Sequence, residues 1–216
     1  CIARLVPQKG IELIKHTIKH IVDKRGQFVL LGSSPIPSIN AEFHRLKHHY
    51  TEHPHISLTL HHQEELAHLI YAGCDMFIVP SIFEPCGLTQ LIALKYGTVP
   101  IVRRTGGLAD TIFDVDHSGR PIEQTNGYTF DFPDAEGIDS ALDRAIHCWF
   151  EEPEKWRNII LHGMKMDFSW NIPSNEYLEI YRSLRNLDRA TEPSSLSKTE
   201  AATPVPLPPM AGKEPK

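Results

Sequence analysis

Few cysteines, no long apolar run and no excess of positive charge mark this chain, and each absence excludes a class of protein. The four cysteines, Cys1, Cys74, Cys86 and Cys148, form no CxxC pair, so free thiols in a reducing compartment are expected. No apolar run approaches the roughly 18 residues of a membrane span, and no secretory leader pattern is visible. A net charge of −5 supplies no positive field, so nucleic acid is not an expected partner.

The composition is that of a globular protein, with 216 residues, 41% of them hydrophobic and 23% charged. Apolar runs of strand length alternate with segments of helical periodicity. The expected strands cover residues 2–6, 27–32, 55–60, 75–81, 98–103 and 126–132, and the expected helices cover 11–22, 41–52, 64–73, 87–97, 134–150, 153–165 and 174–187. This alternation predicts an α/β fold with a doubly wound, Rossmann-like parallel sheet.

The two ends of the chain carry separate expectations. Residues 188–216 hold six prolines and almost no large apolar side chains, so we expect a disordered tail there and a folded domain over 1–187. The chain begins at Cys1, inside an apolar run and without a methionine. We therefore expect the natural polypeptide to be longer.

Ligands of doubly wound sheets bind where strands end and helices begin. The first such loop carries Arg4 and Lys9 beside Gly10, and two cations with a helix N-terminus could hold a diphosphate. Solvated surface charges are the alternative for this pair.

A single carboxylate, Glu84, stands in the otherwise apolar run "SIFEPCGLTQLIAL". Pro85 disfavours helix at Glu84, Gly87 allows a close backbone approach, and Thr89 offers a hydroxyl in a first helical turn. A carboxylate held ahead of a phosphate-binding helix end can accept hydrogen bonds from sugar hydroxyls. A simple helix cap is the alternative.

Three stretches, "ARLVPQKG", "PSIFEPCGLTQLIALKYGTVPIVRRTGGLADT" and "NGYTF", strongly resemble the C-terminal half of starch and bacterial glycogen synthases. These are retaining glycosyltransferases of the GT-B fold. The stretches "LLGSSP" and "IYAGCDMFIVPSIFEPCGL" are most similar to plant soluble starch synthases. The resemblance implies an ADP-glucose donor, an α-1,4-glucan acceptor, an N-terminal GT-B domain missing from this chain, and a plastid location.

The resemblance also assigns roles to individual residues. Arg4 and Lys9 match the basic pair that neutralises the diphosphate, and Glu84 matches the acidic residue beside the donor sugar. Backbone and hydroxyl contacts to phosphate and sugar are implied for Cys86, Gly87, Leu88 and Thr89. The loop closing the other side of the diphosphate is implied for Thr105, Gly106 and Gly107.

Two positions depart from related transferases. A second glutamate often follows the first by eight residues, but Ile92 stands there, as in the synthase branch. The position that often holds a tyrosine or phenylalanine against the nucleobase is His62, and an imidazole stacks over less area.

The thirteen histidines raise the question of a metal. His44 with His48, and His49 with His53, have the i, i+4 spacing of two ligands on one helix face, but no acidic or cysteine partner stands at ligand spacing. We therefore expect a solvated face and no metal. His68 lies on the helix leading toward the donor loops, and Cys86 has no neighbouring base to make it a nucleophile.

The expected reaction is retaining transfer of glucose to the non-reducing end of the glucan, without a metal or other cofactor. Front-side attack assisted by the leaving diphosphate is the implied route, because no covalent nucleophile is visible. Two alternatives remain open: a non-catalytic nucleotide- or glucan-binding module, and a phosphorylase or epimerase on the same fold.

Overall fold

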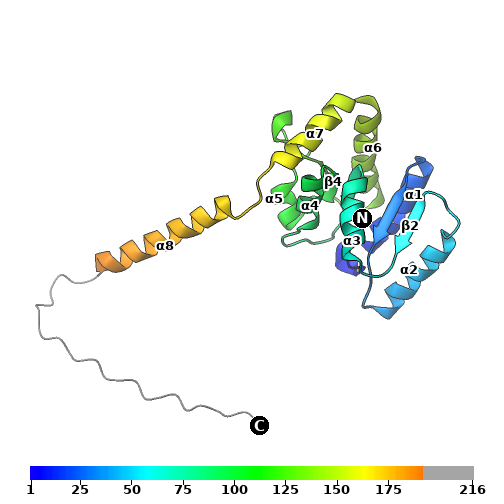
Figure 1. Cartoon of the computed structure of the whole chain (residues 1–216), viewed down its shortest axis with the longest axis horizontal. Helices are drawn as coiled ribbons and strands as arrows, with labels where there is room; N and C mark the ends of the chain where they lie inside the picture. Colours follow the sequence, from blue (N-terminus) through cyan, green and yellow to red (C-terminus); the bar gives the residue numbers. More distant parts are fainter. Residues whose placement is uncertain (192–216) are drawn as a thin grey trace, which may run out of the picture. The chain divides into compact units, whose positions relative to one another are not determined.

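A computed structural model describes residues 1–191 of the chain, which divides into two compact units, Cys1–Phe168 and Ser169–Lys216. The first unit holds every strand of the described residues, together with helices α1 to α7 (Figure 1). The second contains α8 (Asn171–Thr191). The expected tail falls largely on residues 192–216, which lie outside the described residues, whereas residues 188–191 belong to α8.

The strands are short, apolar and parallel. Strand β1 (Phe28–Leu31) pairs with β2 (Ile56–Thr59), and a second sheet has the order β3 (Met76–Val79), β4 (Val99–Arg103), β5 (Tyr128–Phe130). The predicted parallel α/β class is confirmed. Helices alternate with the strands along the chain: α1 (Ile11–Asp23), α2 (Pro37–His49), α3 (Glu64–Gly73), α4 (Thr89–Tyr96), α5 (Gly106–Thr111), α6 (Ala135–Glu151) and α7 (Pro153–Lys165).

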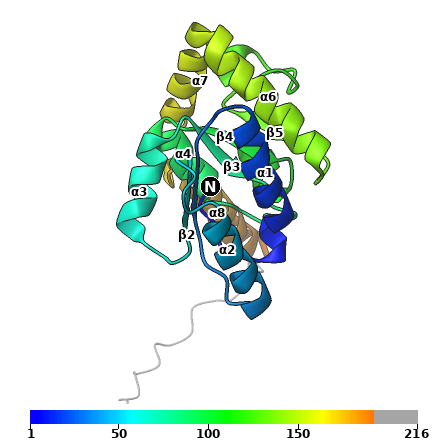
Figure 2. The same cartoon turned by 90° about the vertical axis from the view of Figure 1, so that its right-hand side faces the viewer.

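Alternating side chains of the strands enter two apolar clusters, which places a layer of helices on each face. Leu30, Ile78 and Ile101 pack in the cluster that contains residues of α1, α2, α6 and α7. Their neighbours Leu31 and Phe77 pack with α3, α4 and α5. Helices α1 and α6 lie against each other on the first face (Figure 2), as in a doubly wound sheet.

Three elements differ from the sequence-based expectation. The strand expected over 2–6 is reduced to a bridge between Ile2 and Leu31. Leu5 N–H donates a hydrogen bond to Ser33 O, but among the described residues no backbone bond from Ser33 N–H returns to the first segment, so the ladder does not continue. Helix α2 begins at Pro37 rather than near 41, since proline is favoured in the first helical turn. The segment expected as a loop after β4 contains α5.

All four cysteines are free, as predicted. Among the described residues no helix is long and apolar enough to cross a bilayer.

Candidate functional site

The carboxyl ends of β1 and β3 border a cleft of about 310 Å³. Four of the residues that the sequence assigned to a ligand site line it together: Arg4, Lys9, His62 and Thr89. They come from the segment before α1, the segment before α3 and the first turn of α4. The structure therefore gathers side chains separated by up to 85 positions at the edge where parallel α/β folds bind ligands.

Lys9 forms an ion pair with Glu84, which lies next to the cleft residues Lys9 and Ser81 but is not itself among the lining residues. The carboxylate is buried, with 7% of Glu84 exposed, and its Oε2 also accepts a hydrogen bond from Ser81 Oγ at 2.9 Å. No partner of Oε1 lies within hydrogen-bond distance among the described residues. Glu84 is thus held by two donors, both of which bind Oε2.

The loops that carry these two side chains touch through their backbones. Gly10 has φ +70°, and a Cβ atom there would lie 2.0 Å from Pro80 O. Gln8 O accepts from Ile82 N at 2.8 Å, and the Gln8 side chain donates to Phe83 O at 3.0 Å. Glycine is required at position 10 because any side chain would separate the loops.

Arg4 is exposed and makes no ion pair with any residue of the described part of the chain. A guanidinium free at the rim of a cleft can bind an anion without first losing a partner. The predicted basic pair thus consists of one free cation, Arg4, and one cation paired with Glu84.

The segment from Glu84 to Thr89 turns sharply into α4. Gly87 has φ +75°, and the fully buried Gln90 donates its side-chain N–H to Gly87 O at 3.0 Å and to Thr111 Oγ1 at 3.2 Å. No side chain caps the helix, so the first backbone N–H groups of α4 remain open to an anion. Cys86 and Leu88 are exposed and do not line the cleft.

Thr105, Gly106 and Gly107 lie behind the Glu84 loop rather than in the lining of the cleft. Gly107 N donates to Glu84 O at 3.0 Å. A Cβ atom on Gly106 would lie 2.1 Å from Glu84 O, and one on Gly107 would lie 2.0 Å from Cys86 O. In this structure Thr105–Gly107 supports the backbone of the Glu84 loop.

The histidines considered from sequence take different places. The His62 side chain is 78% exposed, with Nε2 3.4 Å from Glu64 Oε2, so the imidazole is free to stack on a ligand. His68 Nδ1 lies 2.7 Å from Tyr96 Oη. A third pair, His16 and His20 on α1, was not predicted from the sequence, although it has the same i, i+4 spacing as His44 and His48.

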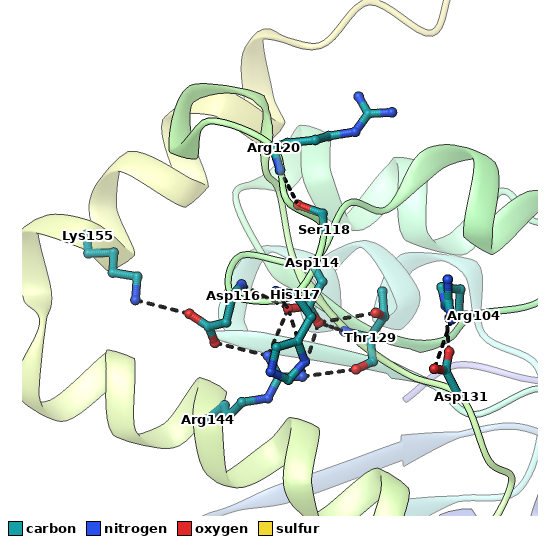
Figure 3. Close-up of polar contacts among 10 residues, drawn as sticks. All are labelled: Arg104, Asp114, Asp116, His117, Ser118, Arg120, Thr129, Asp131, Arg144 and Lys155. Atoms are coloured by element: carbon teal, nitrogen blue, oxygen red, sulfur yellow. Dashed lines mark hydrogen bonds and ion pairs between the residues drawn. The ribbon is translucent and has the colours of Figure 1, made fainter.

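A second polar cluster joins β5 to α6 and was not anticipated (Figure 3). Asp114, only 3% exposed, accepts hydrogen bonds from the Arg144 guanidinium at 2.9 and 3.1 Å and from Asp116 N at 2.9 Å; Thr129 N also donates to it. Burial acts to raise the pKa of Asp114, but these donors outweigh it and hold that pKa below its ordinary value. Because the charges at its centre neutralise one another, the cluster is a structural brace.

Parallel α/β units of this kind bind ligands in the cleft at the carboxyl ends of their strands, and the family match says which class this one belongs to. Residues 1–160 match the family model described as "Glycosyl transferases group 1", so the chain belongs to this family of glycosyltransferases.

Within the family the chain is similar to glucan synthases. It is 78% identical over 184 residues to a glycogen synthase of Protochlamydia amoebophila, covering 85% of this chain and 37% of that protein. It is 48% identical over 190 residues to the probable starch synthase 4, chloroplastic/amyloplastic, of Arabidopsis thaliana, covering 88% of this chain and 18% of that protein.

A solved structure of a starch synthase domain is also similar to this chain. The catalytic domain of starch synthase IV from Arabidopsis thaliana bound to ADP and acarbose has a TM-score of 0.81 and 48% identity, over 85% of this chain and 37% of that one. The fold is thus that of GT-B glycosyltransferases. The chain spans only 37% of the length of the Protochlamydia relative.

Proposed function

We propose that this chain is the donor-binding, C-terminal half of a glucan synthase that transfers glucose from ADP-glucose to the non-reducing end of an α-1,4-glucan with retention. One observation carries the proposal: Arg4, Lys9, His62 and Thr89 line one cleft in a chain that is similar to a starch synthase domain solved with ADP and acarbose.

The residues of the cleft suit a leaving diphosphate. Arg4 and the open N-terminus of α4 offer positive charge before any ligand arrives, and Lys9 can share its charge between Glu84 and a phosphate oxygen. Negative charge grows on the diphosphate as the glycosidic bond breaks, so donors fixed in place stabilise the transition state more than the bound donor. No metal is needed in this scheme.

Glu84 suits the sugar rather than the phosphate. Its Oε2 is occupied by Lys9 and Ser81, and Oε1 can accept a hydrogen bond from a glucose hydroxyl. A carboxylate near the anomeric carbon also offsets the positive charge that develops there. We assign Glu84, Arg4 and Lys9 to the reaction and His62 to the nucleobase.

The acceptor side of the site is proposed to come from an N-terminal GT-B domain outside this chain. The exposed apolar side chains beside Glu84 support this, since Phe83 is 55% and Leu88 66% exposed. Such side chains are more favourable against a partner or a glucan than in water.

A plastid location is the remaining part of the proposal, and the relatives support it unequally. The plastid expectation is supported by the Arabidopsis starch synthase, whereas the relative of higher identity is a bacterial glycogen synthase and supports glycogen as the product. Imaging a fluorescent fusion of the full-length protein in its own cell tests the plastid proposal.

The test of the reaction is to incubate the full-length protein with radiolabelled ADP-glucose and glycogen, and separately with glucose 1-phosphate. Incorporation from ADP-glucose alone is expected. Incorporation from glucose 1-phosphate would identify a phosphorylase, and ADP binding without incorporation would identify a binding module.

A further inference from the structure

Helices α1 and α6 present two facing pairs of potential metal ligands. His16 and His20 lie one turn apart on α1, and Asp139 and Asp143 lie one turn apart on α6. His16 Nε2 is 2.8 Å from Asp139 Oδ1, and His20 Nδ1 is 3.2 Å from the same oxygen. His20 Nε2 is 2.7 Å from Asp143 Oδ1.

The ligand atoms of three of these side chains approach one another more closely than in any other such group in the described part of the chain. His16, His20 and Asp139 form the only trio of histidine, cysteine or carboxylate groups there whose ligand atoms all lie within 4.8 Å of one another. His44 and His48 on α2 share the spacing of the α1 pair but have no such carboxylate. The difference comes from packing, because α6 lies against α1.

The spacing is close to that of a zinc site. Ligands about 2.0–2.2 Å from a tetrahedral ion lie roughly 3.3 Å from one another, so the observed nitrogen-to-oxygen distances need to open by only a few tenths of an ångström. The side chains are partly exposed, at 35% for His16, 14% for His20 and 28% for Asp139, so an ion can reach them from solvent.

We propose that His16, His20 and Asp139 form a binding site for Zn²⁺, with a water molecule in the fourth position. Two histidines one helical turn apart are a recurrent zinc-binding arrangement. Asp143 contacts the other ring nitrogen of His20, Nε2, and would orient that imidazole toward the ion. Lys24 Nζ lies 2.9 Å from Asp143 Oδ1 and can keep that contact when the ion binds.

A bound ion would link α1 to α6 and stabilise the first unit. Because α1 begins directly after Lys9 and Gly10, the ion would also fix the helix that leads out of the proposed donor cleft. The competing interpretation is that the His–Asp contacts are only hydrogen bonds between helices.

The test uses the longest natural form of the protein that contains this chain, without a histidine tag and after chelator treatment. Titration with ZnCl₂ in a calorimeter should show one tight site per chain, and MgCl₂ should show none, since magnesium prefers all-oxygen ligands. At a hundredfold excess of Zn²⁺ over Kd, the Tm should rise by about 5 °C.

Matched variants locate the site. The double variant His16→Gln/His20→Gln should bind Zn²⁺ at least about tenfold more weakly, whereas His44→Gln/His48→Gln should bind like the parent. If the first variant does not fold, Asp139→Asn alone decides, since it keeps the shape of the side chain. The proposal is overturned if the parent binds no Zn²⁺ tightly, if the α1 and Asp139 variants bind like the parent, or if the α2 variant loses the same affinity.

Discussion

Lys9 Nζ contacts Glu84 Oε2 across 75 positions of sequence, so the proposed diphosphate cation and the proposed sugar carboxylate form one ion pair. Each side chain therefore holds the other in place. An electrostatic site that is already organised does not have to rearrange as charge develops in the transition state.

The first prediction concerns the carboxylate. In the full-length protein, Glu84→Gln should lower kcat by about a hundredfold or more, the scale of losing one electrostatic partner of the transition state. An amide oxygen can still accept from Ser81 and Lys9, so ADP affinity and Tm should stay close to the parent values. Turnover, ADP titration and thermal unfolding check this, with the exposed Glu65→Gln as control. A large loss of Tm with turnover preserved would show that Glu84 is a structural cap.

The second prediction concerns the cation. Lys9→Ala should weaken ADP binding by about tenfold to a hundredfold, the range for a charged hydrogen bond, and should also lower kcat. Calorimetric titration with ADP and initial rates at saturating ADP-glucose measure the two effects. Lys47→Ala, which removes an exposed lysine of α2, should change neither. Unchanged affinity and rate in Lys9→Ala would refute the diphosphate assignment.

A third prediction tests the close contact between Gly107 and the Glu84 loop. Gly107→Ala places a Cβ atom 2.0 Å from Cys86 O, so the Glu84 loop must move; Tm should fall by several degrees and turnover with it. Gly73→Ala is the matched control, because nothing lies within 4 Å of its Cβ position. Equal melting temperatures for the two variants would show that the contact at Gly107 relaxes freely.

The fourth prediction concerns acid stability. The pKa of Asp114 is lowered in the folded state, so its contribution is complete above the unfolded-state pKa of about 3.9 and is lost as the pH falls through the folded-state value. Asp114→Asn should reduce the free energy of unfolding by about 2 kcal/mol or more at pH 7, and the difference should narrow below pH 4.

Urea unfolding at several pH values measures this effect. The control is Asp131→Asn, which breaks the ion pair between Asp131 (51% exposed) and Arg104 (59% exposed). This variant should lower the free energy of unfolding by less than about 1 kcal/mol. If the loss of unfolding free energy in Asp114→Asn does not change with pH, the charge of Asp114 does not stabilise the fold and the prediction is wrong.

The fifth prediction follows from the share of the relatives that the chain covers. Residues 1–216 alone should bind ADP weakly and transfer no glucose, because both domains complete a GT-B cleft. Glucan elongation by this purified chain would show that its active site needs no second domain.

Local patterns were sufficient for much of the fold. Helix α3 and helix α7 begin and end where the sequence predicted, because each has a clear periodicity and a clear boundary. Helix α5 was missed since "TGGL" has the composition of a turn, and its glycines are explained only by the backbone they meet at Glu84 and Cys86.

The site was predictable in part for the same reason. The positions of Arg4, Lys9 and Thr89 at strand ends follow from topology, whereas His62 was named only through the family resemblance. The structure brings all four to one cleft. Lys9 pairs with Glu84, and Asp139 lies against His16 and His20 of α1, only because distant segments pack together. A local sequence pattern does not predict such packing.

The backbone contacts at Gly10, Gly106 and Gly107 also tell a protein engineer where diversity can be placed. A library that randomises these three positions would consist mostly of misfolded clones, since a side chain at each would overlap a carbonyl oxygen. Phe83 and Leu88 flank Glu84 in the sequence, are exposed to solvent and can be varied without that penalty. Selection for altered acceptor choice should therefore begin at these two exposed positions and leave the glycines fixed.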